Sequence, residues 1–479
     1  MPVPGTNSGL AADLLIELRR DSPVALHRQI ETAIRDGIRS GRLQLGAALP
    51  PTRTLAAQLR VSRGVVVEAY QQLAAEGFVV ARQGSGTQVA GIQQPPAAPR
   101  PAVSGPAVEH EVAYDLRVGT PDLSAFPRRA WLAAIRQVLN VLPHDALGYG
   151  DPGGVPELAA ELAAYLGRVR AADAPAARLV VVNGVAQGLD LVIRALARTG
   201  PVPLAVEDPH SERTHALLGA AGAVRLPVPV DGQGIDVGAL RRGPARVVLV
   251  TPAHQYPTGV VLSPRRRAEL IAWAAEVDGL VLEDDYDAEF RYDRDPVGCL
   301  QGLCPQRVVL LGSVSKSLAP GLRLGWLVAP PPLAEAVRRA RAQSDLGSPV
   351  IDQYALARLI ASGAYDRHLR QMRRRYRARR DAMVEALARW LPGATVHGVS
   401  AGIQLYLELP PGLDQDAVVR VAAERGVAVQ AAAPLRAGRD RPPALMLGFA
   451  RLPEHRIADA VRLLAEAASQ PGSQGLRGG

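Results

Sequence analysis

Residues 308–326 read VVLLGSVSKSLAPGLRLGW, an apolar run followed by a polar turn that carries Lys316. A short apolar run of this kind predicts a buried strand that ends in a loop. The chain has 55 lysine and arginine residues, and Lys316 is the single lysine among them. Arginine stays protonated and forms no imine, so a lone lysine beside Ser313, Ser315 and Arg323 indicates a reactive amine next to phosphate-binding groups.

Similar apolar runs occur on both sides of this stretch and are separated by helical segments. They are RLVVVNG at 178–184, PLAVEDP at 203–209, ARVVLVTP at 245–252, GLVLEDDYD at 279–287 and LGWLVAP at 324–330. The alternation predicts an α/β domain with a mostly parallel sheet, because strands that are apolar throughout must be covered on both faces. From about residue 333, Arg-rich helices precede strand-like segments at 395–410 and 444–450, which predicts a smaller α+β lobe.

The composition excludes several classes of protein. With 479 residues, 48% of them hydrophobic, the chain can build two or three ordinary cores, so global disorder is excluded. No stretch approaches the roughly 20 apolar residues of a membrane span, and the first twenty residues, which include Asp13 and Glu17, do not resemble a signal peptide, so we expect a cytoplasmic protein. Cys299 and Cys304 are too few for a disulfide framework or a zinc site, and we expect both to be reduced. The net charge of +9 permits DNA binding without requiring it.

The N-terminal part of the chain has a different pattern. Apolar residues recur at helical spacing over 23–40, 52–59 and 63–76, and Thr52 and Ser62 are expected to cap the last two helices. FVVARQGSGTQVA at 78–90 predicts two strands around a turn. Three helices and a hairpin make a winged helix-turn-helix. We therefore divide the chain into a leader (1–20), a winged helix (21–91), a Pro-rich linker (92–112), a second domain (113–470) and a flexible tail (471–479).

The winged helix closely resembles the GntR type of DNA-binding domain. The match includes L-P-x-x-R-x-L-A at 49–56, V-S-R at 61–63 and the G-x-G-T wing at 84–87. The start of the third helix then faces the major groove and the wing approaches the minor groove or backbone of double-stranded DNA. One departure is that Gly64 and Val65 follow V-S-R, where many members carry Thr. A winged helix used for protein contacts is the alternative. The candidate DNA-binding residues are Arg53, Ser62, Arg63, Gly64, Val65, Gln83 and Gly84.

Two motifs upstream of Lys316 suit a phosphorylated aldehyde cofactor. Asp284 and Tyr286 lie two residues apart, hence on one face of the predicted strand, where a carboxylate can keep a pyridine nitrogen protonated and a phenol can donate to a ring oxygen. NGVAQG at 183–188 predicts a turn that opens a helix, whose first amides can receive a phosphate. Each motif alone has an ordinary alternative, a solvated strand end and a plain helix start.

In this order the motifs resemble those of fold-type I aminotransferases, which bind pyridoxal 5'-phosphate. With the GntR-like domain in front and TPAHQYPTG at 251–259, the chain resembles the MocR family of regulators. The resemblance implies a Schiff base between the cofactor and Lys316, and it implies that MocR proteins form head-to-tail homodimers. The implied cofactor-binding residues are Asp284, Tyr286, His254 and Gln255 at the ring, Ser313, Ser315, Arg323, Gly184, Val185, Ala186 and Gln187 at the phosphate, and His210 nearby. Tyr149 in YGDPGG matches a tyrosine that reaches the cofactor of the partner subunit in aminotransferases, and simple packing is its alternative role.

The motifs for amino-acid recognition depart from the aminotransferase pattern. The family commonly has R-L-G-F where this chain has Met446 in LMLGFAR, and Arg451 is not expected to replace the missing arginine. The E-D-P-G-Y element reads EDPHS, so Ser211 stands at the aromatic position, His210 is the remaining flat side chain and Arg213 is a candidate for binding an anion. We therefore expect a transcriptional regulator that senses pyridoxal phosphate or an amino compound. The alternative is a working aminotransferase with a vestigial DNA-binding module.

Overall fold

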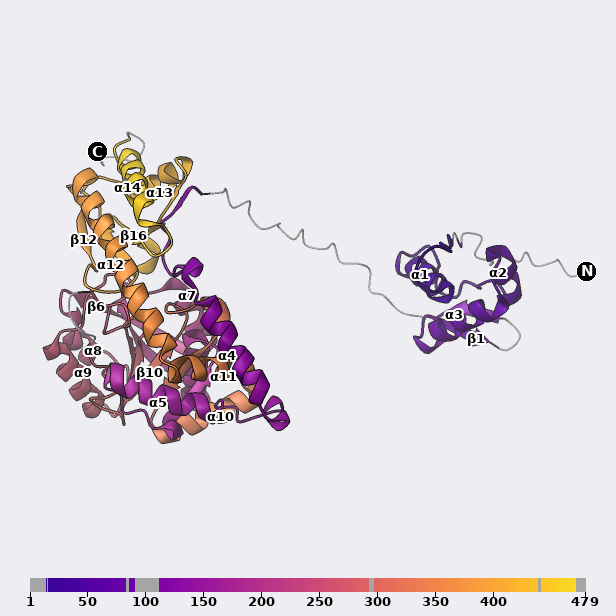
Figure 1. The fold of residues 1–479 in the computed structure, drawn as a ribbon, viewed down its shortest axis with the longest axis horizontal. Helices are drawn as coiled ribbons and strands as arrows, with labels where there is room; N and C mark the ends of the chain where they lie inside the picture. Colours follow the sequence, from indigo (N-terminus) through magenta and orange to yellow (C-terminus); the bar gives the residue numbers. More distant parts are fainter. Residues whose placement is uncertain are drawn as a thin grey trace, which may run out of the picture. The chain divides into compact units, whose positions relative to one another are not determined.

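The computed structural model describes residues 14, 16–82, 86–90, 112–292, 297–437 and 441–470, without the side chain of Arg213. The chain divides into two compact units, Met1–Val108 and Glu109–Gly479 (Figure 1). The expected linker (92–112) and tail (471–479) fall almost entirely outside the described residues, as do Gln83 and Gly84 of the wing.

The N-terminal unit is a small helical domain with a hairpin, as the sequence predicts. Its core consists of apolar side chains at helical spacing, among them the fully buried Ile30, Ile34 and Leu73. The hairpin strands pair antiparallel, with Val79 opposite Val89. The elements are α1 (Leu26–Arg39), α2 (Thr52–Leu59), α3 (Arg63–Ala75), β1 (Val79–Arg82) and β2 (Gly86–Val89).

Of the two predicted helix caps in this unit, Ser62 stands at the cap position and Thr52 does not. Thr52 is the first residue of α2, and Pro51 precedes the helix in the cap position. Ser62 does precede α3, but its side chain makes no capping hydrogen bond. The proline fixes the entry into α2 without a side-chain bond. The exposed Ser62 hydroxyl therefore remains available to a ligand outside the helix.

The larger unit contains an eight-stranded sheet in the order β4-β11-β10-β9-β8-β5-β6-β7. Strands β10, β9, β8, β5 and β6 are parallel neighbours, whereas β11 runs antiparallel to both β10 and β4. The strands are β4 (Leu179–Val182), β5 (Val202–Asp208), β6 (Ala223–Asp231), β7 (Gly234–Ile235), β8 (Val247–Val250), β9 (Leu280–Asp284), β10 (Val308–Ser313) and β11 (Gly325–Val328).

Helices cover both faces of this sheet, which is why its strands are apolar throughout. Leu311 packs toward a cluster with side chains of α6, α7 and α10. The neighbouring Leu310 points to the other face, toward α5, α11 and α12, and α8 and α9 cover the rest of that face. The helices are α4 (Arg128–Val141), α5 (Pro156–Arg170), α6 (Val185–Leu196), α7 (Glu212–Ala220), α8 (Val237–Arg242), α9 (Pro264–Glu276), α10 (Pro331–Ser344) and α11 (Val350–Ala361).

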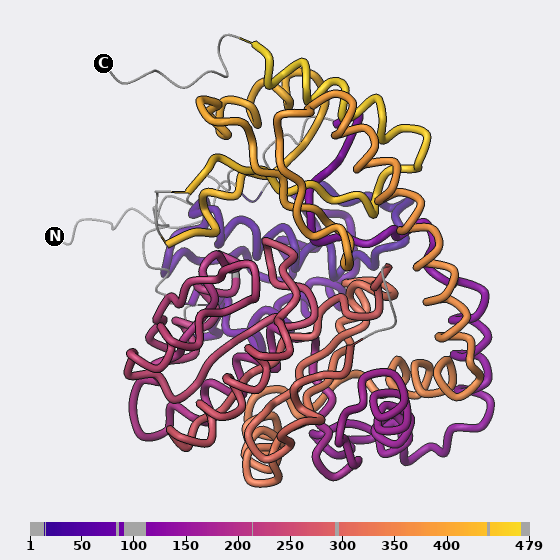
Figure 2. The backbone as a smooth tube through the Cα atoms, turned by 90° about the vertical axis from the view of Figure 1, so that its left-hand side faces the viewer, coloured from indigo at the N-terminus to yellow at the C-terminus, as the bar shows by residue number. Residues whose placement is uncertain are grey.

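A smaller lobe follows, as expected, and is built on a four-stranded antiparallel sheet in the order β12-β13-β16-β15. The long helix α12 runs from the large lobe along the small one (Figures 1 and 2). A short parallel pair, β3 with β14, ties the start of this unit to the small lobe. The elements are β3 (Tyr114–Asp115), α12 (Ala364–Trp390), β12 (Thr395–His397), β13 (Gln404–Glu408), α13 (Gln415–Glu424), β14 (Val427–Ala428), β15 (Gln430–Ala431), β16 (Ala444–Gly448) and α14 (Glu454–Ala468).

The core of the large lobe can be tested at Leu311, which is fully buried in β10. We expect Leu311→Ala to lower the free energy of unfolding by about 3 kcal/mol, because it removes apolar contacts and leaves a cavity. All 4 tryptophans of the chain lie in this unit, so urea unfolding followed by tryptophan fluorescence reports on it. Leu303→Ala, at a position 63% exposed, is the matched control and should cost less than about 0.5 kcal/mol.

Candidate functional site

The site is a cavity of about 660 Å³ at the carboxyl ends of the parallel strands. His210 follows β5, Thr251 follows β8, and Asp284 and Ser313 are the last residues of β9 and β10, and all four line the cavity. Ligands of open α/β sheets bind in the crevice outside the carboxyl ends of the strands, which is where this cavity lies. The small lobe contributes Gln404, Gln430 and Leu435 to the opposite wall.

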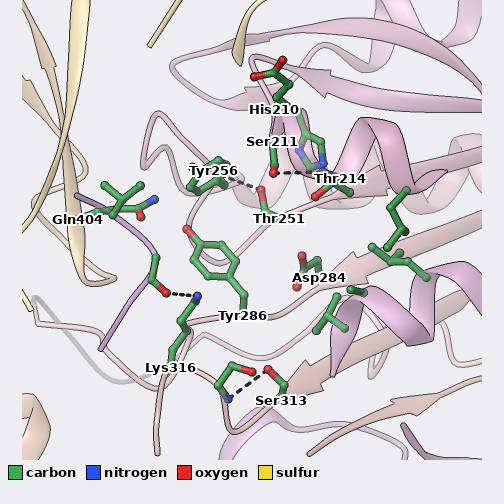
Figure 3. A pocket seen from close by; sticks show the side chains of 18 of the residues that line it. His210, Ser211, Thr214, Thr251, Tyr256, Asp284, Tyr286, Ser313, Lys316 and Gln404 are labelled. Carbon is green, nitrogen blue, oxygen red and sulfur yellow. Dashed lines mark hydrogen bonds between the residues drawn. The ribbon is translucent and has the colours of Figure 1, made fainter. Parts of the chain in front are cut away.

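Lys316 and Asp284 face each other across this cavity (Figure 3). The Lys316 ammonium donates to the carbonyl of Gly119, which belongs to the segment before α4. Asp284 Oδ1 is buried and has no hydrogen-bond partner among the described residues. Burial, with Asp285 and Asp287 nearby, raises the pKa of Asp284 from 3.8 to about 7, and Lys316 opposes this rise. An unpartnered carboxylate oxygen in such a cavity indicates a ligand that donates a hydrogen bond to it.

Polar groups at the floor of the cavity can receive a phosphate. Ser313 Oγ accepts a hydrogen bond of 3.3 Å from the Ser315 amide, and both residues line the cavity with Arg323. Helix α6 begins at Val185, so its first amides point toward this floor. Gly184 has a φ of +86°, and a Cβ there would lie 3.1 Å from the Arg323 guanidinium, so the approach of Arg323 requires glycine.

The structure corrects the predicted positions of Tyr286 and His254. Strand β9 ends at Asp284, so Tyr286 lies in the following bend and not on the same strand face, although both residues line the cavity. His254 Nδ1 lies 3.0 Å from the Tyr286 hydroxyl and 3.0 Å from Asp287 Oδ2. His254 is not among the lining residues, so it contacts the phenol from behind. We conclude that His254 positions Tyr286.

Four other predicted residues do not line the cavity, and Gly184, which lies against Arg323, is one of them. Gln255 Oε1 accepts from the Thr258 hydroxyl at 2.6 Å, and its amide nitrogen donates to the carbonyls of Tyr256 and Pro209, so it braces its own loop against the loop that follows β5. The Gln187 amide donates to Asp345, and its oxygen accepts from the Asn183 amide at 2.7 Å, so it braces the start of α6. Tyr149 is 92% exposed. The prediction that it reaches a partner subunit stays a prediction.

His210 does line the cavity, where it is only 3% exposed. Neither ring nitrogen has a hydrogen-bond partner among the described residues. Burial first, and then His215 and Arg225, lowers the pKa of His210 to about 3, so the ring is neutral at physiological pH. Its amide donates to the carbonyl of Leu435 at 2.8 Å, and the Ala437 amide donates to Asp208 Oδ1 at 2.8 Å. These two bonds hold the lobes together at the mouth of the cavity.

The departures from the aminotransferase pattern have structural counterparts. Met446 is fully buried in an apolar cluster and does not line the cavity. Arg451 pairs with Asp115, as expected for a residue that does not replace the missing arginine. Ser211 lines the cavity, and its hydroxyl accepts from the Thr214 amide at 3.4 Å at the start of α7.

Sequence reasoning missed about half of the cavity wall, because most of these residues lie outside the recognised motifs. Tyr256 lies in TPAHQYPTG, for which the resemblance implies the two preceding residues, His254 and Gln255, instead. Gln404 and Gln430 lie in the small lobe, which only the tertiary fold brings to the site. The missed lining residues are Val118, Gly119, Thr120, Leu189, Glu212, Thr214, Leu217, Thr251, Tyr256, Gln404, Gln430 and Leu435.

In the N-terminal unit the predicted DNA-binding residues of α2 and α3 gather at one place. Arg53, Ser62, Arg63 and Gly64 are all exposed. Arg63 Nε lies 3.4 Å from the Thr52 hydroxyl, which joins the starts of the two helices. A Cβ on Gly64 would meet nothing closer than Ser62 Oγ at 3.8 Å, so its surface is open. Val65 is partly buried and packs against the domain core instead.

Comparison with known proteins agrees with both halves of the structure. Residues 26–89 match the family "Bacterial regulatory proteins, gntR family", and residues 114–464 match "Aminotransferase class I and II". The probable rhizopine catabolism regulatory protein MocR of Rhizobium meliloti is 32% identical over 86% of this chain and 87% of its own. The pyridoxine biosynthesis transcriptional regulator PdxR of Corynebacterium glutamicum is 33% identical over 96% of this chain and 100% of its own.

Solved structures similar to the C-terminal unit are aminotransferases. The multiple substrate aminotransferase of Thermococcus profundus has a TM-score of 0.69 and 29% identity, over 75% of this chain and 92% of its own. LysN of Thermus thermophilus, an α-aminoadipate aminotransferase solved with N-(5'-phosphopyridoxyl)-L-leucine, has a TM-score of 0.67 and 28% identity, over 74% of this chain and 91% of its own.

The chain is thus a transcriptional regulator that joins a GntR-type DNA-binding domain to an aminotransferase-like domain of fold type I. It belongs to the MocR family, as its motifs predict. Its fold is the one that pyridoxal phosphate-dependent aminotransferases use. Within the described residues, every helix is too short or too polar to span a bilayer.

The buried carboxyl of Asp284 makes the stability of the cofactor-free protein depend on pH. Its raised pKa means that the folded chain binds this proton more tightly than the unfolded chain, so the stability it contributes is complete below about pH 4 and is lost as the pH rises through about 7. We expect Asp284→Asn to raise the free energy of unfolding more at pH 8 than at pH 5, by about 2 kcal/mol. Urea unfolding at both pH values measures the difference.

The control for this experiment is Asp459→Asn, which removes an exposed carboxyl from α14. This variant should change the free energy of unfolding by the same small amount at both pH values. A gain for Asp284→Asn that is independent of pH would contradict the buried, protonated state of the carboxyl.

The exposed arginine at the start of α3 can be tested by DNA binding. We expect Arg63→Ala to weaken binding of the full-length protein to its promoter DNA about tenfold or more, since a guanidinium on a base edge or phosphate is lost. Fluorescence anisotropy with labelled promoter DNA measures the affinity. Arg198→Ala removes an exposed arginine from the C-terminal domain and should leave it unchanged, whereas equal losses in both variants would indicate only a general charge effect.

Proposed function

We propose that the C-terminal domain binds pyridoxal 5'-phosphate in the cavity at the strand ends. We further propose that its occupancy, by the cofactor alone or together with an amino compound, sets the affinity of the winged helix for double-stranded promoter DNA. The observation that carries the proposal is the buried, unpartnered Asp284 Oδ1, which shares a cavity with the only lysine of the chain.

The residues present fit this cofactor at three points. Asp284 would accept a hydrogen bond from the pyridine nitrogen, and Tyr286 would donate to the ring oxygen, with His254 behind it. Lys316 would hold the aldehyde carbon covalently. When bound, the cofactor supplies an aldehyde that bonds to primary amines and a ring that withdraws electrons. This chain's own residues orient the ring and keep a proton at Asp284 or on its partner.

The phosphate would be held at the floor of the cavity. Ser313, Ser315 and Arg323 provide hydroxyl, amide and guanidinium donors there. The amides of Val185 and Ala186 at the N-terminus of α6 add the positive end of a helix dipole. A dianionic phosphate group thus meets one full positive charge and several oriented donors.

The alternative function, a working aminotransferase, is disfavoured by the substrate side of the cavity. A transaminase holds two successive substrates by the same anionic group. Met446 occupies the place of the expected arginine, and Arg451 is engaged by Asp115. We therefore expect the purified protein, with an amino donor and a keto acid, to make little product while it still binds promoter DNA.

We also infer that the regulator acts in the cytoplasm as a homodimer. Its DNA target places it with the chromosome. Side chains of α4 and of the segment after it are apolar and exposed, as a surface covered by a second copy would be. The residues are Leu132, Leu139, Val141, Leu147 and Tyr149, and they are exposed by 53–92%. Exposure of Tyr149 in the single chain is compatible with its contacting the cofactor of a partner.

Substitution of Lys316 tests the covalent attachment. We expect Lys316→Ala and Lys316→Arg both to lose the visible absorption of the cofactor-loaded protein, because neither side chain can form an imine, while tryptophan fluorescence shows an intact fold. The arginine variant keeps the positive charge and so separates the loss of the amine from the loss of charge. An unchanged visible spectrum in either variant would contradict the proposal.

The regulatory part is tested by anisotropy titrations of labelled promoter DNA with and without pyridoxal phosphate. If the cofactor is the sensed ligand, the wild-type protein changes its DNA affinity on addition of cofactor alone, and the two Lys316 variants respond less. If only an added amino acid changes the affinity, the cofactor is a fixed part of the site and the amino compound is the signal.

A further inference from the structure

The small-lobe wall of the cavity is made of amide and apolar side chains. Gln404 on β13 and Gln430 on β15 line the cavity. Met446 on the central strand β16 pairs with Tyr406 on one side and Gln430 on the other. Paired residues of neighbouring strands share a face, and Gln404 shares it too because it lies two residues before Tyr406. This face of the sheet therefore carries Gln430, Met446, Tyr406 and Gln404, and of these four the two glutamines line the cavity.

The amide of Gln404 lacks a partner in this wall. The side chain is 2% exposed, and Nε2 has no hydrogen bond to any described residue. A primary amide carries two N–H donors, and leaving them unpaired in a buried place is costly. Because Gln404 lines the cavity, an acceptor atom of a ligand is the group that would satisfy it (Figure 3).

The region around Met446 is apolar. Met446 clusters with Tyr406 and Leu435, and Val118 and Tyr256 pack against this cluster. Val118, Tyr256 and Leu435 are the members that line the cavity. A carboxylate held against such a wall loses its hydration without gaining a counter-charge, which weakens its binding.

The neighbouring basic groups are engaged elsewhere. Arg436 donates to the Tyr406 hydroxyl and to the carbonyl of Pro442, and Arg451 is paired with Asp115. His210 has both ring nitrogens unpartnered in the cavity and is neutral at physiological pH. Arg323 lies with Ser313 and Ser315, where the proposed function places the phosphate, and the Lys316 amine donates to the Gly119 carbonyl and is the group that the proposed function joins to the aldehyde.

We infer that the amino compound recognised with the cofactor is an amine bearing an uncharged hydrogen-bond acceptor, such as an amide or hydroxyl oxygen, which accepts from Gln404 Nε2. An α-carboxylate is not the group that this wall selects. This inference rests on the proposed function, because the cofactor is taken to fill the other side of the cavity. Gln404 is thereby the residue that determines specificity.

The test is calorimetric titration of the full-length, cofactor-loaded protein with L-alaninamide and with L-alanine, which differ only in the amide and the carboxylate. With dissociation constants referred to the free-amine forms, we expect L-alaninamide to bind about tenfold more tightly or better, the effect of one buried hydrogen bond and one unpaired charge. Equal binding, or tighter binding of L-alanine, overturns the inference.

Two pairs of variants sharpen the test. Gln404→Leu should weaken L-alaninamide about tenfold and leave L-alanine unchanged, whereas Gln371→Leu, on the exposed face of α12, should change neither. Met446→Arg should shift the preference toward L-alanine, and Met446→Leu should keep it. Retained visible absorption of the cofactor shows that each variant is folded. If Gln404→Leu weakens both probes equally, its role is structural and the inference fails.

The outcome separates this inference from the function on which it rests. If the wild-type protein shows no visible cofactor absorption, the proposed function itself is wrong. If the cofactor is bound but neither probe binds at millimolar concentration, cofactor sensing stands and the assigned class of amine is overturned.

Discussion

The constraint on which the C-terminal domain depends is that the carboxyl group of Asp284 and the amino group of Lys316 line one cavity. Asp284 ends β9 and Lys316 follows β10, and these strands are parallel neighbours in which Asp284 is aligned with Leu311. Parallel pairing thus brings the two groups to the same edge of the sheet, although 31 positions separate them in the chain. Burial raises the pKa of this carboxyl to about 7, so a cationic partner that binds near it favours its charged form. The apolar strands and the helices that cover them are what make this burial possible.

The sequence predicted those features that depend on local chemistry. The cavity is lined by the unique Lys316, by Asp284 and Tyr286, and by Val185 and Ala186 at the start of α6, because short segments at strand ends place their side chains with little freedom. The helices and hairpin of the winged helix also lie where periodicity put them. Strand β11 is different: its apolar run cannot show direction, and it is antiparallel to its neighbours.

Features set by tertiary contacts could not be predicted. Gln255 carries the donors and acceptors expected of a ring contact, but they bond to Thr258 in its own loop and to the Pro209 carbonyl in the loop after β5. Gln404 and Gln430 have no motif, and only the docking of the small lobe brings them to the cavity. The cap of α2 was predicted wrongly because Pro51 can start this helix through its fixed φ without a side-chain hydrogen bond. In each case the deciding partner is distant in sequence or is a backbone group.

The bonds between the lobes at the cavity mouth have a mechanical consequence. His210 reaches the Leu435 carbonyl and Asp208 reaches the Ala437 amide through hydrogen bonds of 2.8 Å, a length that allows little stretching. A bulky ligand that pushes Leu435 outward would have to break both hydrogen bonds, at a cost of about 1 kcal/mol each. A ligand large enough to displace Leu435 therefore has to offset this cost with its own contacts in the cavity.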